Sequence, residues 1–226
     1  GILDPTMTYS VKEIFYTLQG EGGQAGTPAV FCRFAGCNLW TGREQDRPNA
    51  ICQFCDTDFV GTDGTHGGKY ASCDELALKI ALQWPSSDKT NRFVVLTGGE
   101  PLLQVDEELI NALHAENFTI AVESNGTIIA PKGLDWLCIS PKAGTYSSNA
   151  ATPWVQKNGN ELKVVWPQAG FTETDLNRFA ADPTLQFANK YLSPMDNANH
   201  TNNIQACIDM CLKNPAWKLS LQTHKM

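Results

Sequence analysis

The stretch FVVLTGGEP, residues 93–101, joins an apolar run to a glycine-rich polar turn, a combination that sets the pattern for the chain. Its first part is short, apolar and rich in β-branched side chains, which predicts a buried strand over Phe93–Thr97. Gly98 and Gly99 then predict a sharp change of backbone direction. Glu100 adds a carboxylate that suits the amino group of an amino-acid-like ligand. A plain strand-to-loop turn is the alternative, and the motif alone leaves both open.

Similar apolar runs recur along the chain and alternate with helical patterns, which is typical of βα units and a mainly parallel sheet. The further expected strands are Ala29–Phe34, Thr119–Glu123, Trp136–Ser140, Leu162–Trp166, Phe187–Leu192 and Lys218–Gln222. The expected helices are Asp74–Trp84 after a cap at Ser72, Glu107–Glu116, Asn203–Lys213 and one after Thr172. The segment Ser10–Gly23 precedes the first expected strand and ends in a loop by composition. Too few helices are visible for a complete eight-fold barrel, so we expect an α/β fold with a partial, open barrel of about six strands.

Polar residues gather directly after successive expected strands. Arg33 and a cysteine-rich segment lie at the end of the first strand, and the other groups are Thr97–Pro101, Glu123–Gly126, Ser140–Lys142, Ser193–Asp196 and Thr223–Lys225. The carboxyl ends of parallel strands meet at one mouth, where barrels and open α/β enzymes place their chemistry. The sequence therefore predicts a functional site built from these segments.

Composition and charge exclude several classes of function. With 226 residues, of which 42% are hydrophobic and 18% charged, the chain fits one large globular domain. A net charge of −7 argues against nucleic acid as a partner, because such surfaces need clustered Lys and Arg. No apolar run is long enough to span a membrane and no signal peptide is visible, so we expect no membrane partner and a cytoplasmic location. Residues 1–6 are interpreted as a remnant of cloning, and residues 7–226 as a single domain.

Three cysteines, Cys37, Cys52 and Cys55, are spaced with fourteen residues in the first gap and two in the second. Three thiolates can hold three irons of a cubane cluster and leave the fourth iron open. A zinc site with Cys32 as fourth ligand is the alternative. Strand alternation places Cys32 on the apolar side of its strand, which argues against zinc. The spacing alone leaves both open, and the downstream polar motifs favour a cluster that binds and cleaves S-adenosylmethionine.

Four charged or titratable side chains near the predicted mouth have a structural and a functional interpretation. Arg33, on an apolar strand, needs either an internal carboxylate or an anionic ligand, and we favour the ligand because its fork fits a carboxylate. Lys142 is either a solvated loop lysine or a site residue. Glu123 is either a structural ion pair or a site residue. His224 follows the last expected strand and is a site candidate.

Several longer motifs together resemble one enzyme family, the 7-carboxy-7-deazaguanine synthases, which are radical S-adenosylmethionine enzymes of 7-deazapurine (queuosine) biosynthesis. The motifs are EIFYTLQGEG at 13–22, FCRFAGCNLW at 31–40, CQFCDT at 52–57, TGGEP at 97–101, SPK at 140–142 and LSLQTHK at 219–225. The resemblance covers nearly the whole chain from Met7 onward.

The resemblance implies a modified, incomplete TIM-type barrel and a homodimer. It implies a lyase that converts 6-carboxy-5,6,7,8-tetrahydropterin to 7-carboxy-7-deazaguanine with loss of ammonia. The implied cofactors are a [4Fe-4S] cluster, S-adenosyl-L-methionine and Mg2+, and the implied partners are the small pterin substrate and an electron donor such as flavodoxin. The cofactor supplies the radical that takes hydrogen from C6 of the pterin, while the protein aims and shields it.

The resemblance also implies roles for individual residues. The implied cluster ligands are Cys37, Cys52 and Cys55, and Thr57 is the implied Mg2+ ligand. The residues implied to contact S-adenosylmethionine are Phe54, Cys55, Asp56, Gly99, Glu100, Ser140, Pro141, Lys142, Ser193, Pro194, Met195 and Asp196. The residues implied to bind substrate are Leu18, Gln19, Gly20, Arg33 and Thr97, and the implied catalytic residues are Glu21, Glu123 and His224.

The chain departs from the wider superfamily pattern at one place and from the family pattern at two. Most radical S-adenosylmethionine enzymes space their cysteines as C-x3-C-x2-C, whereas Asn38–Ile51 here form an inserted excursion, a variant that occurs within this family. Ser193 stands where the family pattern has Gln, and the chain ends at Met226, where relatives continue for a few residues. Two alternatives stay open: a radical activase that acts on a partner protein, and a non-catalytic zinc-binding interaction module.

Overall fold

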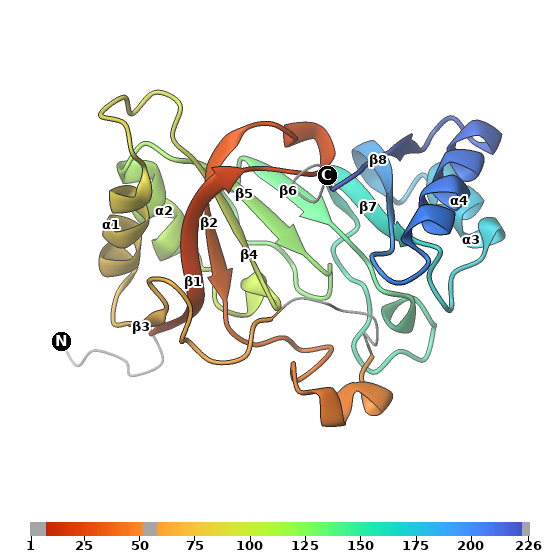
Figure 1. Ribbon diagram of the computed structural model, residues 1–226, viewed down its shortest axis with the longest axis horizontal. Helices are drawn as coiled ribbons and strands as arrows, with labels where there is room; N and C mark the ends of the chain where they lie inside the picture. The colour runs from red at the N-terminus through yellow and green to blue at the C-terminus, as the bar shows by residue number, and fades with distance from the viewer. Residues whose placement is uncertain (1–7, 52–57, 223–226) are drawn as a thin grey trace. The chain divides into compact units, whose positions relative to one another are not determined.

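The computed structural model describes residues 8–51 and 58–222. The chain forms two compact units (Figure 1). Unit 1 comprises Gly1–Thr17, Pro28–Glu123 and Ala130–Trp136, and unit 2 comprises Leu18–Thr27, Ser124–Ile129 and Leu137–Met226. The two units are described in turn.

The sheet of unit 1 has the strand order β3-β1-β2-β4-β5. Its strands are β1 (Tyr9–Leu18), β2 (Pro28–Phe34), β3 (Gly68–Tyr70), β4 (Phe93–Gly98) and β5 (Thr119–Ser124). β1 pairs with β3 in antiparallel fashion, whereas β2, β4 and β5 are parallel to one another. In this register Arg33 on β2 lies opposite Thr97 on β4. The parallel strands therefore end at one edge, where the polar residues begin.

Two helices of unit 1 pack side by side (Figure 1). They are α1 (Cys73–Gln83) and α2 (Glu107–Ala115), and each is capped by the side chain just before it. Ser72 accepts a hydrogen bond from the Glu75 amide, and Asp106 accepts one from the Leu109 amide. These caps satisfy backbone donors that a helix start leaves unpaired. Short 3-10 turns η2 (Glu44–Asn49) and η3 (Pro101–Leu103) follow β2 and β4.

Unit 2 contains a parallel sheet with the order β6-β7-β8-β9. Its strands are β6 (Trp136–Ile139), β7 (Asn158–Trp166), β8 (Gln186–Pro194) and β9 (Lys218–Leu219). Its helices are α3 (Glu173–Ala181) and α4 (His200–Lys213), with 3-10 turns η1 (Gly22–Gln24) and η4 (Ala143–Thr145). A reciprocal capping box between Thr172 and Asp175 starts α3. α4 packs against β8 and β9.

The expected fold class is confirmed, because the structure is α/β with a mainly parallel sheet that does not close into a full barrel. All seven expected strands and all four expected helices occur, although β9 ends at Leu219 and α4 begins earlier, at His200. The segment Ser10–Gly23 does end in a loop, but the expectation that Ala29–Phe34 is the first strand is wrong, because that loop is preceded by the ten-residue strand β1. The charged residues Lys12 and Glu13 at the centre of β1 interrupt the alternation of apolar and polar residues by which a strand is predicted from sequence. Within the described ranges no helix is long and apolar enough to cross a membrane.

Candidate functional site

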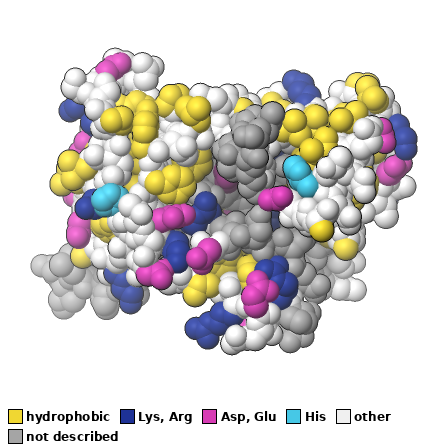
Figure 2. Space-filling view, in the orientation of Figure 1, with side chains coloured by type: hydrophobic (Ala, Val, Ile, Leu, Met, Phe, Trp, Pro, Cys, Tyr) yellow, Lys and Arg dark blue, Asp and Glu magenta, His cyan; other side chains and the backbone are white. Residues whose placement is uncertain are grey.

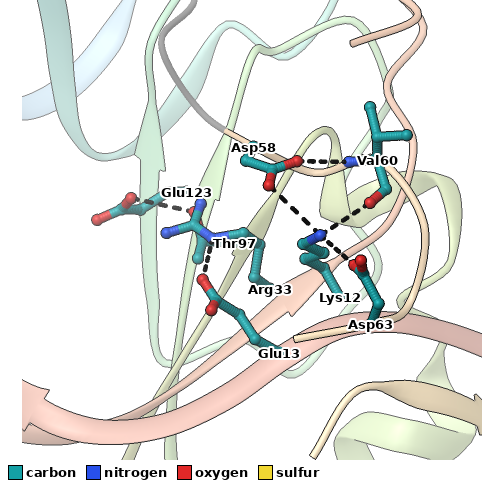
Figure 3. Close-up of polar contacts among 8 residues, drawn as sticks. All are labelled: Lys12, Glu13, Arg33, Asp58, Val60, Asp63, Thr97 and Glu123. Carbon is teal, nitrogen blue, oxygen red and sulfur yellow. Dashed lines mark hydrogen bonds and ion pairs between the residues drawn. The ribbon is translucent and has the colours of Figure 1, made fainter. Parts of the chain in front are cut away.

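A row of polar side chains runs across four neighbouring strands of unit 1 (Figure 3). Arg33 Nε donates to Glu13 Oε1 at 3.0 Å, which links β2 to β1. Thr97 Oγ1 donates to Glu123 Oε2 at 3.4 Å, which links β4 to β5. Arg33 and Thr97 are register partners, so the two pairs form one row. Arg33, Thr97 and Glu123, predicted separately, are thus brought together, and Glu13 is an addition that the sequence did not single out.

Arg33 has the internal carboxylate partner that the sequence left open as one of two interpretations. The side chains of Arg33 and Glu13 are 20% and 31% exposed, so the pair is only partly shielded from water. Glu13 is bonded to the Nε edge of the guanidinium. The opposite edge, with the two terminal nitrogens, is the one that forms a fork with a second carboxylate. An internal partner and an anionic ligand are therefore compatible at this position.

The two cysteines of the β2 segment have different environments. Cys32 is fully buried between strands, and this burial raises the pKa of its thiol well above the ordinary value. Cys37 lies in the loop after β2, is partly exposed, and accepts a hydrogen bond from the Leu39 amide at its Sγ, at 3.4 Å. The expected core position of Cys32 is confirmed, which removes the fourth ligand of the zinc alternative. An amide directed at Cys37 Sγ suits a thiolate ligand.

Several predicted site residues lie outside the described residues. They are Cys52, Phe54, Cys55, Asp56, Thr57 and His224. In the part of the chain that the structure describes, no group of three or more His, Cys, Asp or Glu residues is arranged to hold a metal ion. The ligand set of the cluster and the Mg2+ site at Thr57 therefore stay predictions.

The glycine pair at the end of β4, Gly98 and Gly99, packs directly on the end of β2 and on the loop that carries Cys37. A Cβ at Gly99 would lie 1.8 Å from the carbonyl oxygen of Gly36, and one at Gly98 would lie 2.6 Å from the carbonyl oxygen of Phe34. The Glu100 amide also donates to the Gly36 carbonyl at 2.9 Å. Only residues without a side chain permit this backbone contact. The cradle formed in this way holds the loop that carries Cys37 against the end of β4.

Glu100 is completely buried, and its carboxylate accepts a hydrogen bond from the Leu102 amide at 3.3 Å. This bond caps the 3-10 turn η3. The interpretation of Thr97–Pro101 as a strand-to-loop turn is therefore confirmed. A carboxylate has about four acceptor positions, so a cap on one of them is compatible with a ligand amine on another.

Lys12 on β1 binds the segment Asp58–Asp63, which follows Cys55 in the sequence (Figure 3). Its side chain is 10% exposed, and its Nζ donates to the Val60 carbonyl at 2.9 Å and to Asp63. Asp58 lies 3.4 Å from the same nitrogen. These bonds raise the pKa of Lys12 and lower that of Asp63. Sequence reasoning missed this residue, whose only signal is a lysine between the buried Val11 and Ile14 of a strand.

In unit 2, the last residue of β1 and the loop after it carry four predicted site residues. Leu18 is exposed, whereas Gln19 and Gly20 are buried. The carboxylate of Glu21 lies 2.6 Å from Lys163 Nζ on β7, in an ion pair whose side chains are 13% and 9% exposed. Sequence reasoning missed Lys163. The available signal was a charged residue in an otherwise apolar strand interior.

The ends of β6 and β8 hold the remaining predicted residues of unit 2. Lys142 Nζ donates to Ser140 Oγ at 3.1 Å. Ser193 is 2% exposed and is the register partner of Val165 on β7. Met195 is held by its amide on the Trp166 carbonyl at 3.2 Å. Pro141 and Pro194 are buried, and Asp196 is exposed. The structure thus brings Ser140 and Lys142 together, while a ligand role for Ser193–Asp196 stays a prediction.

Known proteins resemble the chain along nearly its full length, although no family model matches it. The 7-carboxy-7-deazaguanine synthase of Caulobacter vibrioides is 57% identical over 219 residues, covering 97% of this chain and 98% of the relative. The protein of that name from Bradyrhizobium diazoefficiens is 58% identical over 222 residues, with the same coverage. The crystal structure of QueE from Escherichia coli matches with a TM-score of 0.69 and 25% identity, covering 96% of this chain and 95% of that one.

Proposed function

Because the chain belongs to the 7-carboxy-7-deazaguanine synthase family, we propose that it converts 6-carboxy-5,6,7,8-tetrahydropterin to 7-carboxy-7-deazaguanine with release of ammonia. The observation that carries this proposal is the identity of more than half the residues over nearly the full length of both relatives. The enzyme is then a radical S-adenosylmethionine lyase of queuosine biosynthesis.

Cys37, Cys52 and Cys55 would hold a [4Fe-4S] cluster, which with S-adenosylmethionine supplies the one-electron chemistry that removes hydrogen from C6 of the pterin. The residues around Cys37 suit this task. The Leu39 amide stabilises negative charge on Cys37 Sγ, and Gly99 lets the following backbone lie against the loop.

The polar row of unit 1 supports substrate binding. We assign the substrate carboxylate to the terminal nitrogens of Arg33, since a planar guanidinium binds a carboxylate through two parallel hydrogen bonds. Thr97, opposite Arg33, supplies a hydroxyl beside the same position. We assign proton transfer to Glu123, whose carboxylate accepts a hydrogen bond from Thr97 Oγ1.

In unit 2, Ser140 and Lys142 are assigned to the cofactor, and Gln19 and Glu21 to the pterin. Lys142 is a donor for carboxylate or ribose oxygens, and its bond to Ser140 fixes the position of its ammonium group. Thr57 is assigned to Mg2+, because a hydroxyl oxygen is a hard ligand and Mg2+ keeps water and substrate oxygens around it.

The remaining assignments concern partners and location. A reducing protein such as flavodoxin would supply the electron, and a second copy of the chain would complete a homodimer. On the face shown in Figure 2, Lys and Arg side chains are interspersed with Asp and Glu, which does not favour a nucleic-acid partner there. A cytoplasmic location suits a cluster protein whose described cysteines form no disulfide with one another.

The decisive experiment is anaerobic reconstitution with iron and sulfide, followed by incubation with the carboxypterin, S-adenosylmethionine, a reductant and Mg2+. Mass spectrometry should detect 7-carboxy-7-deazaguanine, and leaving out Mg2+ should slow its formation. Cys37→Ala should abolish both cluster absorbance and product, whereas Cys32→Ala is the matched control and should retain both. An iron-loaded parent protein that makes no product would contradict the proposed reaction.

A further inference from the structure

The Glu21–Lys163 ion pair of unit 2 is nearly removed from water. Lys163 Nζ and Glu21 Oε2 are 2.6 Å apart, and their side chains are 9% and 13% exposed. Taking two charges out of water is costly, and a well-packed apolar pair is often at least as stable. Stability alone therefore gives little reason for a charged pair at this position, which suggests that the pair serves the geometry of Glu21.

The loop that carries Glu21 is also fastened directly after that residue. The Gly23 amide donates to Glu161 Oε2 at 2.9 Å, and the Gly22 amide donates to Ser220 Oγ at 3.0 Å. Glu161 lies two residues before Lys163, so both side chains emerge from the same face of β7.

The fit of this loop is tight. Gly22 has a φ of +66°, and a Cβ there would lie 2.5 Å from Glu161 Oε1. Gln19 turns its side chain back onto the loop and accepts a hydrogen bond from the Glu21 amide at 3.2 Å. The backbone around Glu21 is therefore fixed by contacts from β7, from the residue after β9 and from the loop itself.

We propose that Lys163 is a positioning residue for substrate recognition, which acts by holding the Glu21 carboxylate in one orientation. The inference rests on the proposed function, which assigns Glu21 to the pterin. The pyrimidine edge of a pterin presents adjacent N–H donors in a guanidine-like arrangement, and a carboxylate is the natural acceptor for two such donors. The ion pair with Lys163 fixes Glu21 Oε2, so the carboxylate is oriented before the ligand arrives.

Pre-organisation is the physical basis of the effect. A glutamate that must be ordered when the ligand arrives loses affinity, and one that is already fixed does not. Lys163 makes no contact with the reacting centre in this proposal, so its loss should weaken binding through Glu21 alone.

The test is titration calorimetry of the reconstituted protein with the carboxypterin, together with hydrogen exchange of the loop amides. Lys163→Met keeps most of the side-chain length and removes the charge. It should raise Kd about tenfold or more and speed exchange across residues 18–24, while iron content stays at the parental level. Lys163→Arg should recover part of the affinity. Lys213→Met is the matched control, because Lys213 is 62% exposed on α4, and its Kd should equal that of the parent.

A double variant separates action through Glu21 from a general loss of structure. If Lys163 acts through Glu21, Lys163→Met combined with Glu21→Gln should bind no more weakly than Glu21→Gln alone. Parental Kd and parental loop exchange in Lys163→Met would overturn the inference, as would fully additive losses in the double variant. Failure of the parent protein itself to bind the carboxypterin would instead overturn the proposed function, and the inference with it.

Discussion

At the scale of single residues, the polar row of unit 1 holds one cationic side chain between two carboxylates. Glu13 and Glu123 stand at its two ends, with Arg33 and Thr97 between them. The Arg33 guanidinium is partly buried, and the Glu13 carboxylate compensates its positive charge at the Nε edge only. A second carboxylate, brought by a ligand, would bind the remaining nitrogens in the same plane. The row thus has the chemistry of a carboxylate receptor, with Glu13 fixing the orientation of Arg33.

Substitutions at Arg33 and Glu13 distinguish a receptor from an internal ion pair. Arg33→Ala should weaken binding of the carboxypterin by about 2–5 kcal/mol, because the ligand carboxylate loses its partner. Arg33→Lys should recover only part of this, since a point charge cannot form the fork. Glu13→Gln, the control, keeps a hydrogen-bond acceptor for Nε and should retain most of the affinity. Calorimetric titration of each variant measures these differences.

The outcome that would contradict the receptor is equally definite. The receptor is contradicted if Arg33→Ala binds the pterin as tightly as the parent protein does. In that case both Arg33→Ala and Glu13→Gln should unfold at a lower temperature than the parent protein, because each breaks the same ion pair. Arg33 would then serve only as the structural partner of Glu13, and the substrate carboxylate would be held elsewhere.

At the scale of elements, a backbone hydrogen bond joins the two ends of the long segment between Cys37 and Cys52. The Ile51 amide donates to the Leu39 carbonyl at 3.0 Å, so the chain leaves and re-enters at one place. Residues 40–50 are thereby bypassed, and only Asn38, Leu39 and Ile51 remain between Cys37 and Cys52. Three intervening residues is the spacing that most radical S-adenosylmethionine enzymes have in the sequence itself. The excursion therefore preserves the short connection while adding a lobe.

Packing of Trp40 holds the base of this lobe. The indole is 6% exposed and meets the Phe59 ring edge-on at 5.6 Å, while Arg47 lies 4.3 Å above it. Trp40→Ala should remove about 3–5 kcal/mol of packing and reduce the iron bound after reconstitution. Trp40→Phe should keep most of the iron, because an aromatic ring still meets Phe59. Iron and sulfide analysis measures the difference, and full iron content in Trp40→Ala would show that the lobe does not position the cysteines.

The sequence predicted the elements with regular patterns and missed those set by distant partners. Phe93–Gly98 is apolar throughout, so its strand was evident, and Ser72 and Asp106 marked helix starts by local chemistry. β1 was missed because Lys12 interrupts its apolar side, and the reason for that lysine lies some fifty residues away, at Val60 and Asp63. Local patterns carry no information about such partners.

The candidate site divides in the same way. Residue type predicted the turn at Gly98–Pro101, and strand order predicted that Arg33 lies near the end of its strand, beside the other polar residues. Lys163 was not predicted, because a charged residue within a strand has a meaning only once its partner is known, and that partner is 142 residues away in the chain. Ion pairs between distant segments are therefore the part of the site that a single sequence conceals.

At the scale of the whole molecule, the predicted tasks are distributed between the two units. The three predicted cluster ligands fall in the residue range of unit 1, and the loop with Glu21 falls in unit 2. Each is supported by a glycine against which a neighbour packs closely: Gly99 on the carbonyl of Gly36, and Gly22 on the carboxylate of Glu161. The same chemical change, one added methyl group, can therefore be made at either support.

Matched glycine-to-alanine variants test this division. Gly99→Ala places a Cβ 1.8 Å from a backbone oxygen beside Cys37, so the loop must shift and iron content after reconstitution should fall. Gly22→Ala, with a φ of +66° and a Cβ 2.5 Å from Glu161 Oε1, should keep parental iron content and raise Kd for the carboxypterin. Iron analysis and calorimetric titration of each protein provide the two readouts.

Gly26→Ala is the control for backbone strain alone, because its φ is +87° but no atom lies within 4 Å of its Cβ. It should cost about 1–2 kcal/mol of stability and leave iron content and affinity near the parental values. Loss of iron in Gly22→Ala would contradict the division of tasks, because a methyl group in unit 2 would then disturb the cluster. Full iron content in Gly99→Ala would contradict it too, because a methyl group beside Cys37 in unit 1 would then leave the cluster intact.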